Sequence, residues 1–305
     1  MSEKLNATKV NYKLNNGKTM PALGFGTFCA PEDQSIVKDC VIAAVKAGYR
    51  HIDTAYLYQD EKAIGDALQE LFKEGVVKRE ELFITTKVWP NFWDKVEESF
   101  STSLKNLQLE YVDLVLQHWP LCYPKITDNE TGYIVFTPTD DQGNIMEEKD
   151  ASYLETYKQL EKIYLDENDH RIRSIGVSNY TVDNLKDLFR DPTIQTCPSV
   201  NQIAIHPGKP QNEIVDYCQE KGIVVTGYTP YGSQGGPALK LPLIKQLSEK
   251  LDMSVNEVVI SYFLNRNLVI IPRTWKTERL PQSLHYKKLP KEIIEQISNV
   301  KIDFE

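Results

Sequence analysis

Four polar side chains stand near the ends of short apolar runs of the sequence, and their types suit proton transfer. Asp53, Lys87 and His118 each fall near the end of a separate run, and Tyr58 follows Asp53 in the polar stretch beyond it. If the runs are adjacent strands about 4.8 Å apart, their ends bring all four side chains into one pocket.

A pocket of this composition could protonate a carbonyl oxygen. Asp53 stabilises the ammonium of Lys87, and an ammonium near a phenol favours the phenolate, so the pKa of Tyr58 is expected below its usual value of about 10. Tyr58 would then donate a proton near neutral pH, while a neutral His118 orients the carbonyl. No activated Ser or Cys is evident, so the expected attacking group is a cofactor hydride.

Each of these residues also has an ordinary explanation. A single Asp or Lys at a strand end is more often a solvated charge or part of a structural ion pair. Tyr58 alone would be a surface residue, and His118 alone would be a core imidazole. Lys87 is also a candidate nucleophile for a Schiff-base lyase, although Asp53 beside it would keep the amine protonated. The hypothesis therefore depends on the four residues meeting at one end of adjacent strands.

The rest of the chain predicts the frame that holds these residues. Apolar runs alternate with stretches of helical periodicity, and the eight runs are 22–27, 51–55, 83–88, 112–118, 173–178, 199–205, 223–229 and 268–273. Strand-then-helix alternation predicts a parallel sheet with right-handed crossovers, and eight units in 305 residues favour an α/β fold of the closed (β/α)8 barrel type. The active site of such a barrel lies at the carboxyl ends of its strands.

A doubly wound fold is less well supported by the sequence. Its nucleotide-binding turn requires a Gly-x-Gly-x-x-Gly pattern after the first strand, and residues 24–29 lack the third glycine. The Asn15-Asn16-Gly17 sequence within residues 10–21 predicts a β-hairpin that caps one end of the barrel. The polar stretch 121–150, after the fourth strand, is too long for an ordinary connection and predicts a lid. No stretch resembles a linker, so residues 1–305 are expected to form a single domain.

Composition narrows the class of function. The 35 basic and 43 acidic residues give a net charge of −8, which argues against nucleic-acid and acidic-membrane surfaces. Five scattered cysteines without a Cys-x-x-Cys pair indicate reduced thiols in the cytoplasm, and the five histidines lack metal-site spacing. No apolar run is long enough to span a bilayer. We therefore expect a cytoplasmic, monomeric protein that acts on a small molecule without a metal.

Several motifs resemble those of the aldo-keto reductases, in order, from about residue 12 to residue 300. The motifs are Gly48-Tyr-Arg-His-Ile-Asp-Thr-Ala55 with Tyr58, Thr85-Thr-Lys-Val88, Tyr111-Val-Asp-Leu with Gln117-His-Trp-Pro120, Ile175-Gly-Val-Ser-Asn179, Asn201-Gln202 with His206-Pro207, and Ile271-Pro-Arg-Thr274 with Glu278-Arg279. The resemblance implies a (β/α)8 barrel that reduces aldehydes and ketones with NADPH. It places the catalytic tetrad on Asp53, Tyr58, Lys87 and His118.

The resemblance also implies positions for the cofactor. Ser178, Asn179 and Gln202 would hold the carboxamide of the nicotinamide, and Tyr228 would stack on its face. Three residues after the first strand would line the pocket beside the cofactor: Gly26, Thr27 and Phe28.

The residue types also indicate how the far end of the cofactor would be bound. Arg273, Thr274 and Arg279 follow the last strand, and two guanidinium groups with a hydroxyl suit the 2′-phosphate of NADPH. The family usually has Lys-Ser where this chain has Arg273-Thr274, and it commonly has Glu-Asn where Gln282-Ser283 stand. The sequence therefore does not assign the residues that contact the adenine, and Trp275 is a candidate to stack on it.

The predicted substrate pocket is aromatic, with Phe28, Trp89, Trp119 and Tyr123 as its candidates. Aromatic residues at strand ends are equally often the top layer of the core. Few residues follow the last predicted helix, which predicts an open mouth that admits bulky ketones. A non-enzymatic alternative remains: a barrel that binds NADPH to report the redox state to a partner.

Overall fold

The computed structural model describes residues 3–29, 31–233 and 235–301. Within this part of the chain, eight strands form one parallel sheet in which neighbours in sequence are neighbours in space. These strands are β4 (Phe25–Gly26), β5 (His51–Asp53), β6 (Phe83–Val88), β7 (Leu114–Gln117), β8 (Ile175–Ser178), β9 (Val200–Ala204), β10 (Val224–Tyr228) and β11 (Val269–Ile270). Leu23 forms a parallel bridge with Ile270, and the Gly24 N–H donates to the Ile270 carbonyl at 2.9 Å. The two edges therefore meet, and the sheet closes into a barrel.

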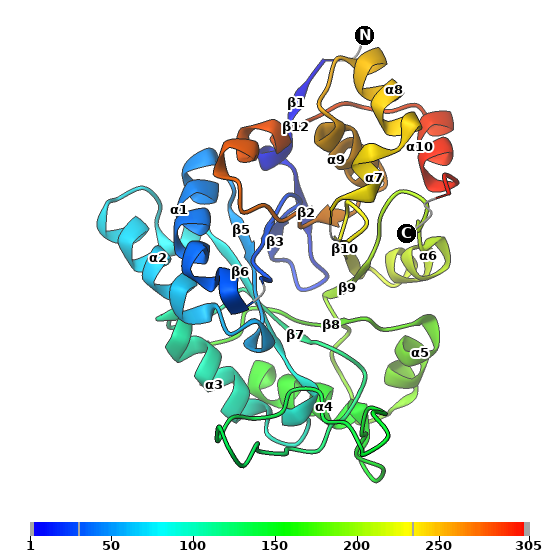
Figure 1. Ribbon diagram of the computed structural model, residues 1–305. Coiled ribbons are helices and arrows are strands. Elements are labelled where there is room, and N and C mark those ends of the chain that lie inside the picture. The colour runs from blue at the N-terminus through cyan, green and yellow to red at the C-terminus, as the bar shows by residue number, and fades with distance from the viewer. Residues whose placement is uncertain (1–2, 30, 234, 302–305) are drawn as a thin grey trace.

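Helices surround the strands, as Figure 1 shows. The helix α2 (Glu61–Lys73) is amphipathic: Ile64, Leu68 and Leu71 recur at three- and four-residue spacing and are buried. The other helices are α1 (Val37–Ala47), α3 (Val96–Leu107), α4 (Tyr153–Leu165), α5 (Val182–Arg190), α6 (Asn212–Glu220), α7 (Pro237–Lys240), α8 (Pro242–Leu251), α9 (Val255–Asn265) and α10 (Lys291–Ser298). Across the described residues, no helix combines the length and apolar character needed to cross a membrane.

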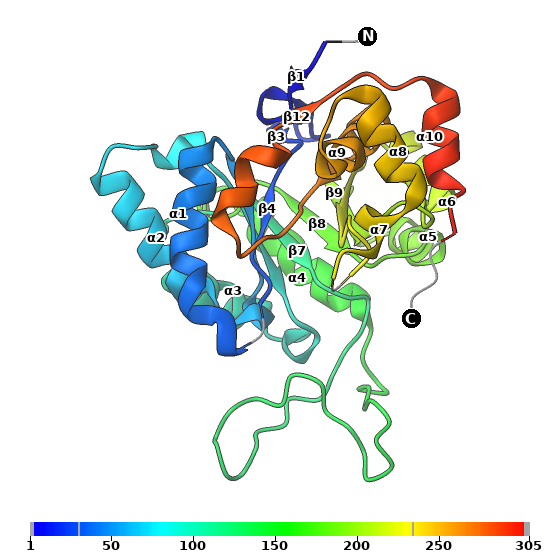
Figure 2. The same cartoon turned by 45° about the horizontal axis from the view of Figure 1, so that its top comes forward.

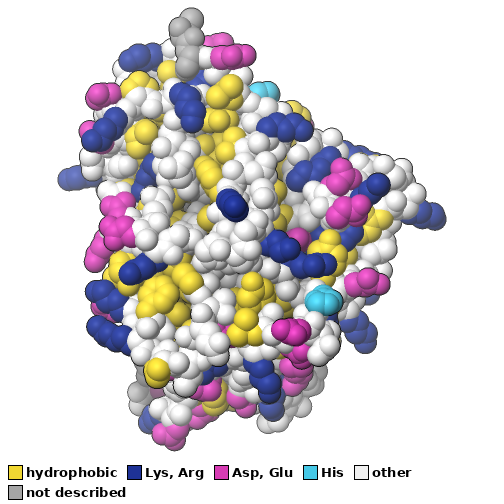
Figure 3. Space-filling model, turned by 180° about the vertical axis from the view of Figure 1, so that it is seen from behind, with side chains coloured by type: hydrophobic (Ala, Val, Ile, Leu, Met, Phe, Trp, Pro, Cys, Tyr) yellow, Lys and Arg dark blue, Asp and Glu magenta, His cyan; other side chains and the backbone are white. Residues whose placement is uncertain are grey.

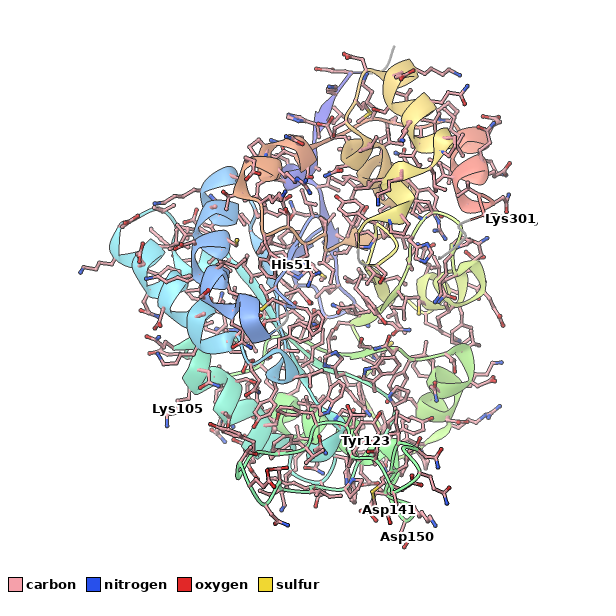
Figure 4. All side chains as sticks on the ribbon, in the orientation of Figure 1. His51, Lys105, Tyr123, Asp141, Asp150 and Lys301 are labelled. Atoms are coloured by element: carbon pink, nitrogen blue, oxygen red, sulfur yellow. The ribbon has the colours of Figure 1, made fainter. Side chains whose placement is uncertain are left out.

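Strand register aligns the polar residues at the carboxyl end of the barrel. Asp53 pairs with Thr85, and Lys87 lies two residues further along β6, so its side chain points to the same side as that of Thr85. One layer below, the His51 Nε2 lies 3.1 Å from the Thr85 Oγ1. His51 is in the middle of the molecule in Figure 4, and burial lowers its pKa to about 4. The barrel interior therefore holds a neutral imidazole directly beneath Asp53.

A hairpin lies at the opposite end of the strands. Its strands β2 (Asn11–Lys13) and β3 (Thr19–Pro21) pair antiparallel. Leu14 and Met20 are buried in one cluster with Phe83, which begins β6. The hairpin thus contributes apolar side chains to the amino-terminal end of the barrel.

The segment 121–150, between β7 and α4, extends away from the barrel (Figure 2). It makes two narrow turns, in which Asp128 and Asp140 each accept backbone N–H groups from residues further along the turn. Asp141 and Asp150 lie at its outer edge in Figure 4. Such Asx turns satisfy the backbone locally, so the segment needs few contacts with the barrel.

Four short elements differ from the sequence prediction. β1 (Leu5–Asn6) pairs antiparallel with β12 (His285–Tyr286), and strands of two residues carry no alternating pattern to detect. The Gly and Pro residues of the stretch 230–238 predict a loop after β10, and the end of this stretch begins the single turn of α7. A helix is predicted near residues 278–284, and the segment is the 3-10 helix η6 (Thr277–Ser283), which has Pro281 in its interior.

Candidate active site

The Lys87 ammonium lies at the centre of the cluster at the carboxyl end of the barrel. Its Nζ donates to Asp53 Oδ1 at 2.6 Å, to the Thr54 carbonyl at 2.8 Å and to the Tyr58 hydroxyl at 3.3 Å. An ammonium has three N–H groups, so each one has an acceptor. Burial by itself lowers the pKa of Lys87, but Asp53 and Tyr58 more than offset it, and the pKa is raised. Lys87 is therefore a fixed cation.

The second oxygen of Asp53 is also occupied. The Gln202 Nε2 donates to Asp53 Oδ2 at 2.7 Å across the barrel. Both members of the ion pair are almost fully buried, with side-chain exposures of 0% for Lys87 and 3% for Asp53. A buried pair of this kind is stable only where its remaining hydrogen bonds are made, and here Thr54 and Gln202 make them.

Tyr58 corrects one expectation from the sequence. Burial of its hydroxyl raises the pKa of Tyr58 to about 12, and the opposing pull of the Lys87 ammonium is smaller. The sequence argument counted the charge of Lys87 but not the loss of water around the phenol, which disfavours the phenolate. Tyr58 therefore keeps its proton at neutral pH, and the expected lowering of its pKa is wrong for this structure.

His118 faces the Tyr58 ring from the end of β7. The two ring centroids are 5.7 Å apart, and the Trp89 ring contacts His118 edge-on at 4.9 Å. Burial, followed by the Lys87 charge, holds the pKa of His118 well below its usual value. The imidazole is therefore neutral, as the sequence predicted, and it carries both a donor and an acceptor nitrogen.

A cavity of about 740 Å³ opens above these four residues, a size typical of ligand and cofactor sites. Many residues predicted for the cofactor or substrate line it, together with Asp53, Tyr58 and His118: Gly26, Thr27, Phe28, Trp89, Trp119, Ser178, Asn179, Gln202, Tyr228 and Arg273. Lys87 lies just beneath the wall and reaches the cavity through Tyr58. The structure therefore gathers the predicted catalytic residues and most of the predicted pocket in one place.

Three predicted residues lie off this wall. Tyr123 is buried behind Trp89, with ring centroids 6.2 Å apart, so it supports the wall rather than lining it. The Thr274 hydroxyl accepts the Lys276 N–H and is thereby engaged within its own loop. Arg279 lies in η6, beyond the cavity. The sequence could not distinguish these three residues from lining residues, because the direction of a side chain beyond a strand end depends on the geometry of the loop.

The hydrogen bonds around Asn179 link three strand ends. Its Nδ2 donates to the His118 carbonyl at 3.0 Å and to the Ser178 Oγ at 3.2 Å, and its Oδ1 accepts the Tyr228 hydroxyl at 2.8 Å. Asn179 has φ of 60°, a left-handed conformation that Asn tolerates better than most residues. This bend turns the amide over the end of β8 toward the cavity.

At the rim, Arg273 spans from the loop after β11 to the loop after β4. Its guanidinium donates to the Phe28 carbonyl and lies 5.9 Å from the Phe28 ring and 5.5 Å from the Trp275 ring. The Phe28 ring in turn contacts the Tyr58 ring edge-on at 5.0 Å. The Phe28 ring thus contacts both the Arg273 guanidinium at the rim and the Tyr58 ring.

Other lining residues were missed by sequence reasoning. Most follow β10, and the set is Leu57, Thr229, Pro230, Tyr231, Ser233, Ile271 and Trp275; among these only Trp275 was singled out, as a possible adenine contact. The only signal was the Gly- and Pro-rich loop after that strand. The segment 121–150 contributes none of the described lining residues, although the Trp89 Nε1 donates to the Phe136 carbonyl at 2.6 Å. It buttresses the wall from outside and does not cover the cavity as the expected lid would.

Comparison with known proteins identifies the family. The model of the aldo/keto reductase family matches residues 22–302. The chain is 36% identical over 302 residues to an aldehyde reductase of Saccharomyces cerevisiae, covering 98% of this chain and 93% of that protein. The chain belongs to the aldo/keto reductase family. A glycerol 2-dehydrogenase (NADP(+)) of the same yeast is 35% identical over 296 residues, covering 96% of this chain and 91% of that protein. An NAD(P)H-dependent D-xylose reductase of Candida tropicalis is 37% identical over 286 residues, covering 89% and 86%.

Family membership confirms the resemblance read from the motifs and makes the protein an oxidoreductase that uses a nicotinamide cofactor to reduce carbonyl groups. Within the described residues, no group of His, Cys, Asp and Glu is arranged to hold a metal ion. On the face of the molecule that Figure 3 shows, Lys and Arg side chains are interspersed with Asp and Glu.

Proposed function

We propose that Tyr58 is the proton donor in the reduction of an aldehyde or ketone, supported by Lys87 and Asp53, with His118 orienting the carbonyl oxygen. The observation that carries this proposal is the set of three hydrogen bonds from the Lys87 ammonium, which joins the phenol to the buried ion pair. The raised pKa of Tyr58 is compatible with the role, because an alkoxide is a far stronger base than a phenolate. The phenolate that remains is then stabilised by the adjacent ammonium.

The cavity fits NADPH, which when bound supplies the hydride. Its walls combine one aromatic face, Tyr228, with the hydroxyl of Ser178 and the amide of Asn179 on adjacent strand ends. These groups would hold the carboxamide after exchanging their present mutual hydrogen bonds. Gln202 also lines the cavity. Its Nε2 donates one N–H to Asp53, which leaves the second N–H and the Oε1 for the cofactor.

Arg273 is proposed to bind the 2′-phosphate that distinguishes NADPH from NADH. Replacing Arg273 with Met is expected to raise the KM for NADPH about 10- to 100-fold, the value of one charge-assisted hydrogen-bonded contact, and to leave the KM for NADH nearly unchanged. Steady-state kinetics with both cofactors measure this. An equal rise for both would mean that Arg273 acts through its packing with Phe28 and Trp275, and would contradict the phosphate assignment.

For the substrate, we propose a small carbonyl compound bound between Trp89, Trp119 and Phe28, of which Phe28 is 52% exposed. The relatives named above act on aldehydes, glycerol and D-xylose by their names, which supports the class without choosing a member. The expected open mouth depended partly on residues 302–305, which lie outside the described residues. A panel of aldehydes and ketones of increasing size, assayed with NADPH, tests the proposal. A sharp fall of kcat/KM for bulky ketones would contradict the open mouth, and no turnover with any member would contradict the function.

Two alternatives have less support. A Schiff-base lyase needs a neutral amine, whereas all three N–H groups of Lys87 are engaged and its pKa is raised. A redox-reporting barrel would not require the phenol, ammonium and imidazole to converge on one cavity. Borohydride trapping of a carbonyl on Lys87 would favour the first alternative, and NADPH binding without oxidation would favour the second.

The wider organisation is also part of the proposal. We infer one domain over residues 1–305, a monomer and a cytoplasmic location, with the hairpin β2–β3 capping the amino-terminal end of the barrel. The cap is supported by the packing of Leu14 and Met20 with Phe83. Four of the cysteines, Cys40, Cys122, Cys197 and Cys218, are free thiols, as suits a reducing compartment.

A further inference from the structure

Asp60 is a buried carboxyl that the reduction as described does not use. It precedes α2, in the position where Asp often caps a helix, yet its side chain makes no capping hydrogen bond. Instead it turns toward the barrel, where the Thr54 hydroxyl donates to its Oδ1 at 2.7 Å. Asp60 is 1% exposed, and in the described part of the chain its Oδ2 has no partner. A helix cap therefore does not explain why a carboxyl stands here.

Thr54 connects this carboxyl to the catalytic cluster. Its hydroxyl donates to Asp60, and its backbone carbonyl accepts one of the three hydrogen bonds of the Lys87 ammonium. Thr54 itself is fully buried, so it has little freedom to change either partner alone. A change in the charge of Asp60 is consequently transmitted to the residue that orients Lys87.

We propose that Asp60 is a positioning residue: through Thr54 it fixes the carbonyl that orients the Lys87 ammonium, and its charge adjusts how readily Tyr58 gives up its proton. This inference rests on the proposed role of Tyr58. A negative Asp60 disfavours the phenolate, so it makes Tyr58 a weaker acid, whereas a neutral Asp60 removes that effect. Asp60 is thus a switch on the acid strength of Tyr58.

The groups around Asp60 determine the pH at which its carboxyl ionises. Burial raises the pKa of Asp60 to about 6, while hydrogen bonds from the side chains of Thr54 and Thr27 and the Lys87 charge on β6 oppose the shift. The other titratable groups facing it are Tyr58 in the 3-10 turn η3 (Tyr56–Tyr58), which precedes α2, and Glu61, the first residue of α2. Burial raises the pKa of Glu61 to about 7, so its titration must be separated from that of Asp60.

The sign follows from these positions. Below about pH 6 Asp60 is neutral and Tyr58 is the stronger acid, so proton donation is faster; above it, the carboxylate forms and donation slows. The single-turnover rate of NADPH oxidation is expected to fall about three- to tenfold as the pH rises through this value. Asp60→Asn keeps an oxygen acceptor for Thr54 but cannot ionise, so its rate is expected to stay high and flat across the same range.

Two further variants make the test specific. Thr54→Val removes the hydroxyl that stabilises the carboxylate, so the inflection is expected to move to higher pH. Glu61→Gln is the matched control: it removes a neighbouring buried carboxyl that binds the Thr86 hydroxyl, at 2.6 Å, instead of Thr54. The inflection near 6 should persist in Glu61→Gln. An inflection that persists in Asp60→Asn, or that disappears in Glu61→Gln, overturns the proposal.

An independent readout does not need turnover. The Tyr58 ring resonance, assigned in isotope-labelled protein by its loss in Tyr58→Phe, is expected to shift through an inflection near pH 6. Thr54→Val should move that inflection upward even if Asp60→Asn fails to fold. Absence of any such shift overturns the Asp60 proposal alone, whereas a shift in a protein that oxidises no NADPH overturns the proposed function alone.

Discussion

Tyr58→Phe is expected to lower kcat for carbonyl reduction by about 10²- to 10⁴-fold, the usual contribution of a positioned proton donor. The substitution removes only the hydroxyl. The remaining ring can still contact Phe28 and His118, whose centroids lie 5.0 Å and 5.7 Å away. The Kd for NADPH should therefore change little. Stopped-flow turnover and fluorescence titration with NADPH measure the two quantities separately.

Tyr56→Phe is a matched control for this experiment. Tyr56 is two positions earlier and packs edge-on against Phe92, at 4.8 Å, away from the cavity wall. It should retain wild-type kcat. If Tyr58→Phe keeps most of its activity, the proton donor has been assigned to the wrong residue. If Tyr58→Phe loses NADPH binding together with kcat, Tyr58 is needed for the structure of the cavity, and its role as an acid is unsupported.

The convergence of the site residues was predictable, because the carboxyl ends of all strands in a parallel barrel lie at the same rim. Asp53, Lys87 and His118 lie on β5, β6 and at the end of β7, and the register of adjacent strands places them at one rim. No loop conformation was needed to bring them together. Tyr58 was harder to place, and only the 3-10 turn that follows β5 directs its hydroxyl back to Lys87.

The electrostatics of the site were not predictable in the same way. The pKa of a phenol depends on how much water surrounds it, and the sequence gives no measure of burial for a residue after a strand end. For His118 the same burial acts with the neighbouring charge, so the expectation of a neutral imidazole survived. For Tyr58 burial acts against the neighbouring charge, and the sign of the shift was therefore open.

The contacts at the cavity rim were likewise not predictable from the sequence. Arg273 was recognisable from its type, but its contact with the Phe28 carbonyl joins segments 245 positions apart in sequence. The residues after β10 were missed because irregular backbone carries no periodicity. The contact of Gln202 with Asp53 was not foreseen, since an amide can serve a cofactor or a carboxylate equally well, and only the fold brings Asp53 Oδ2 within 2.7 Å of the Gln202 Nε2.

Lys87→Met is expected to destabilise the fold more than removal of both members of the ion pair. The single substitution leaves the Asp53 carboxylate buried without its cation, which costs about 3–5 kcal/mol in the free energy of unfolding. In the double variant Asp53→Asn/Lys87→Met, an amide replaces the carboxylate and can still accept the Gln202 Nε2, so a large part of this loss should return. Urea unfolding of the wild type, both single variants and the double variant measures the coupling.

Turnover is not expected to recover in the double variant, although stability is. Neither Lys87→Met nor the double variant retains an ammonium to stabilise the Tyr58 phenolate, so restored stability should bring no restored turnover. Lys46→Met is the surface control: its pair with Glu74, at 3.0 Å, is nearly half exposed, and its loss should cost at most about 1 kcal/mol. A double variant whose loss of stability equals the sum of the two single losses would show that the pair is not energetically coupled. Stability and turnover are expected to diverge because chemistry needs the cation itself, whereas folding needs only that no buried charge stands alone. A double variant that regains turnover would contradict this and show that the charge of Lys87 is dispensable.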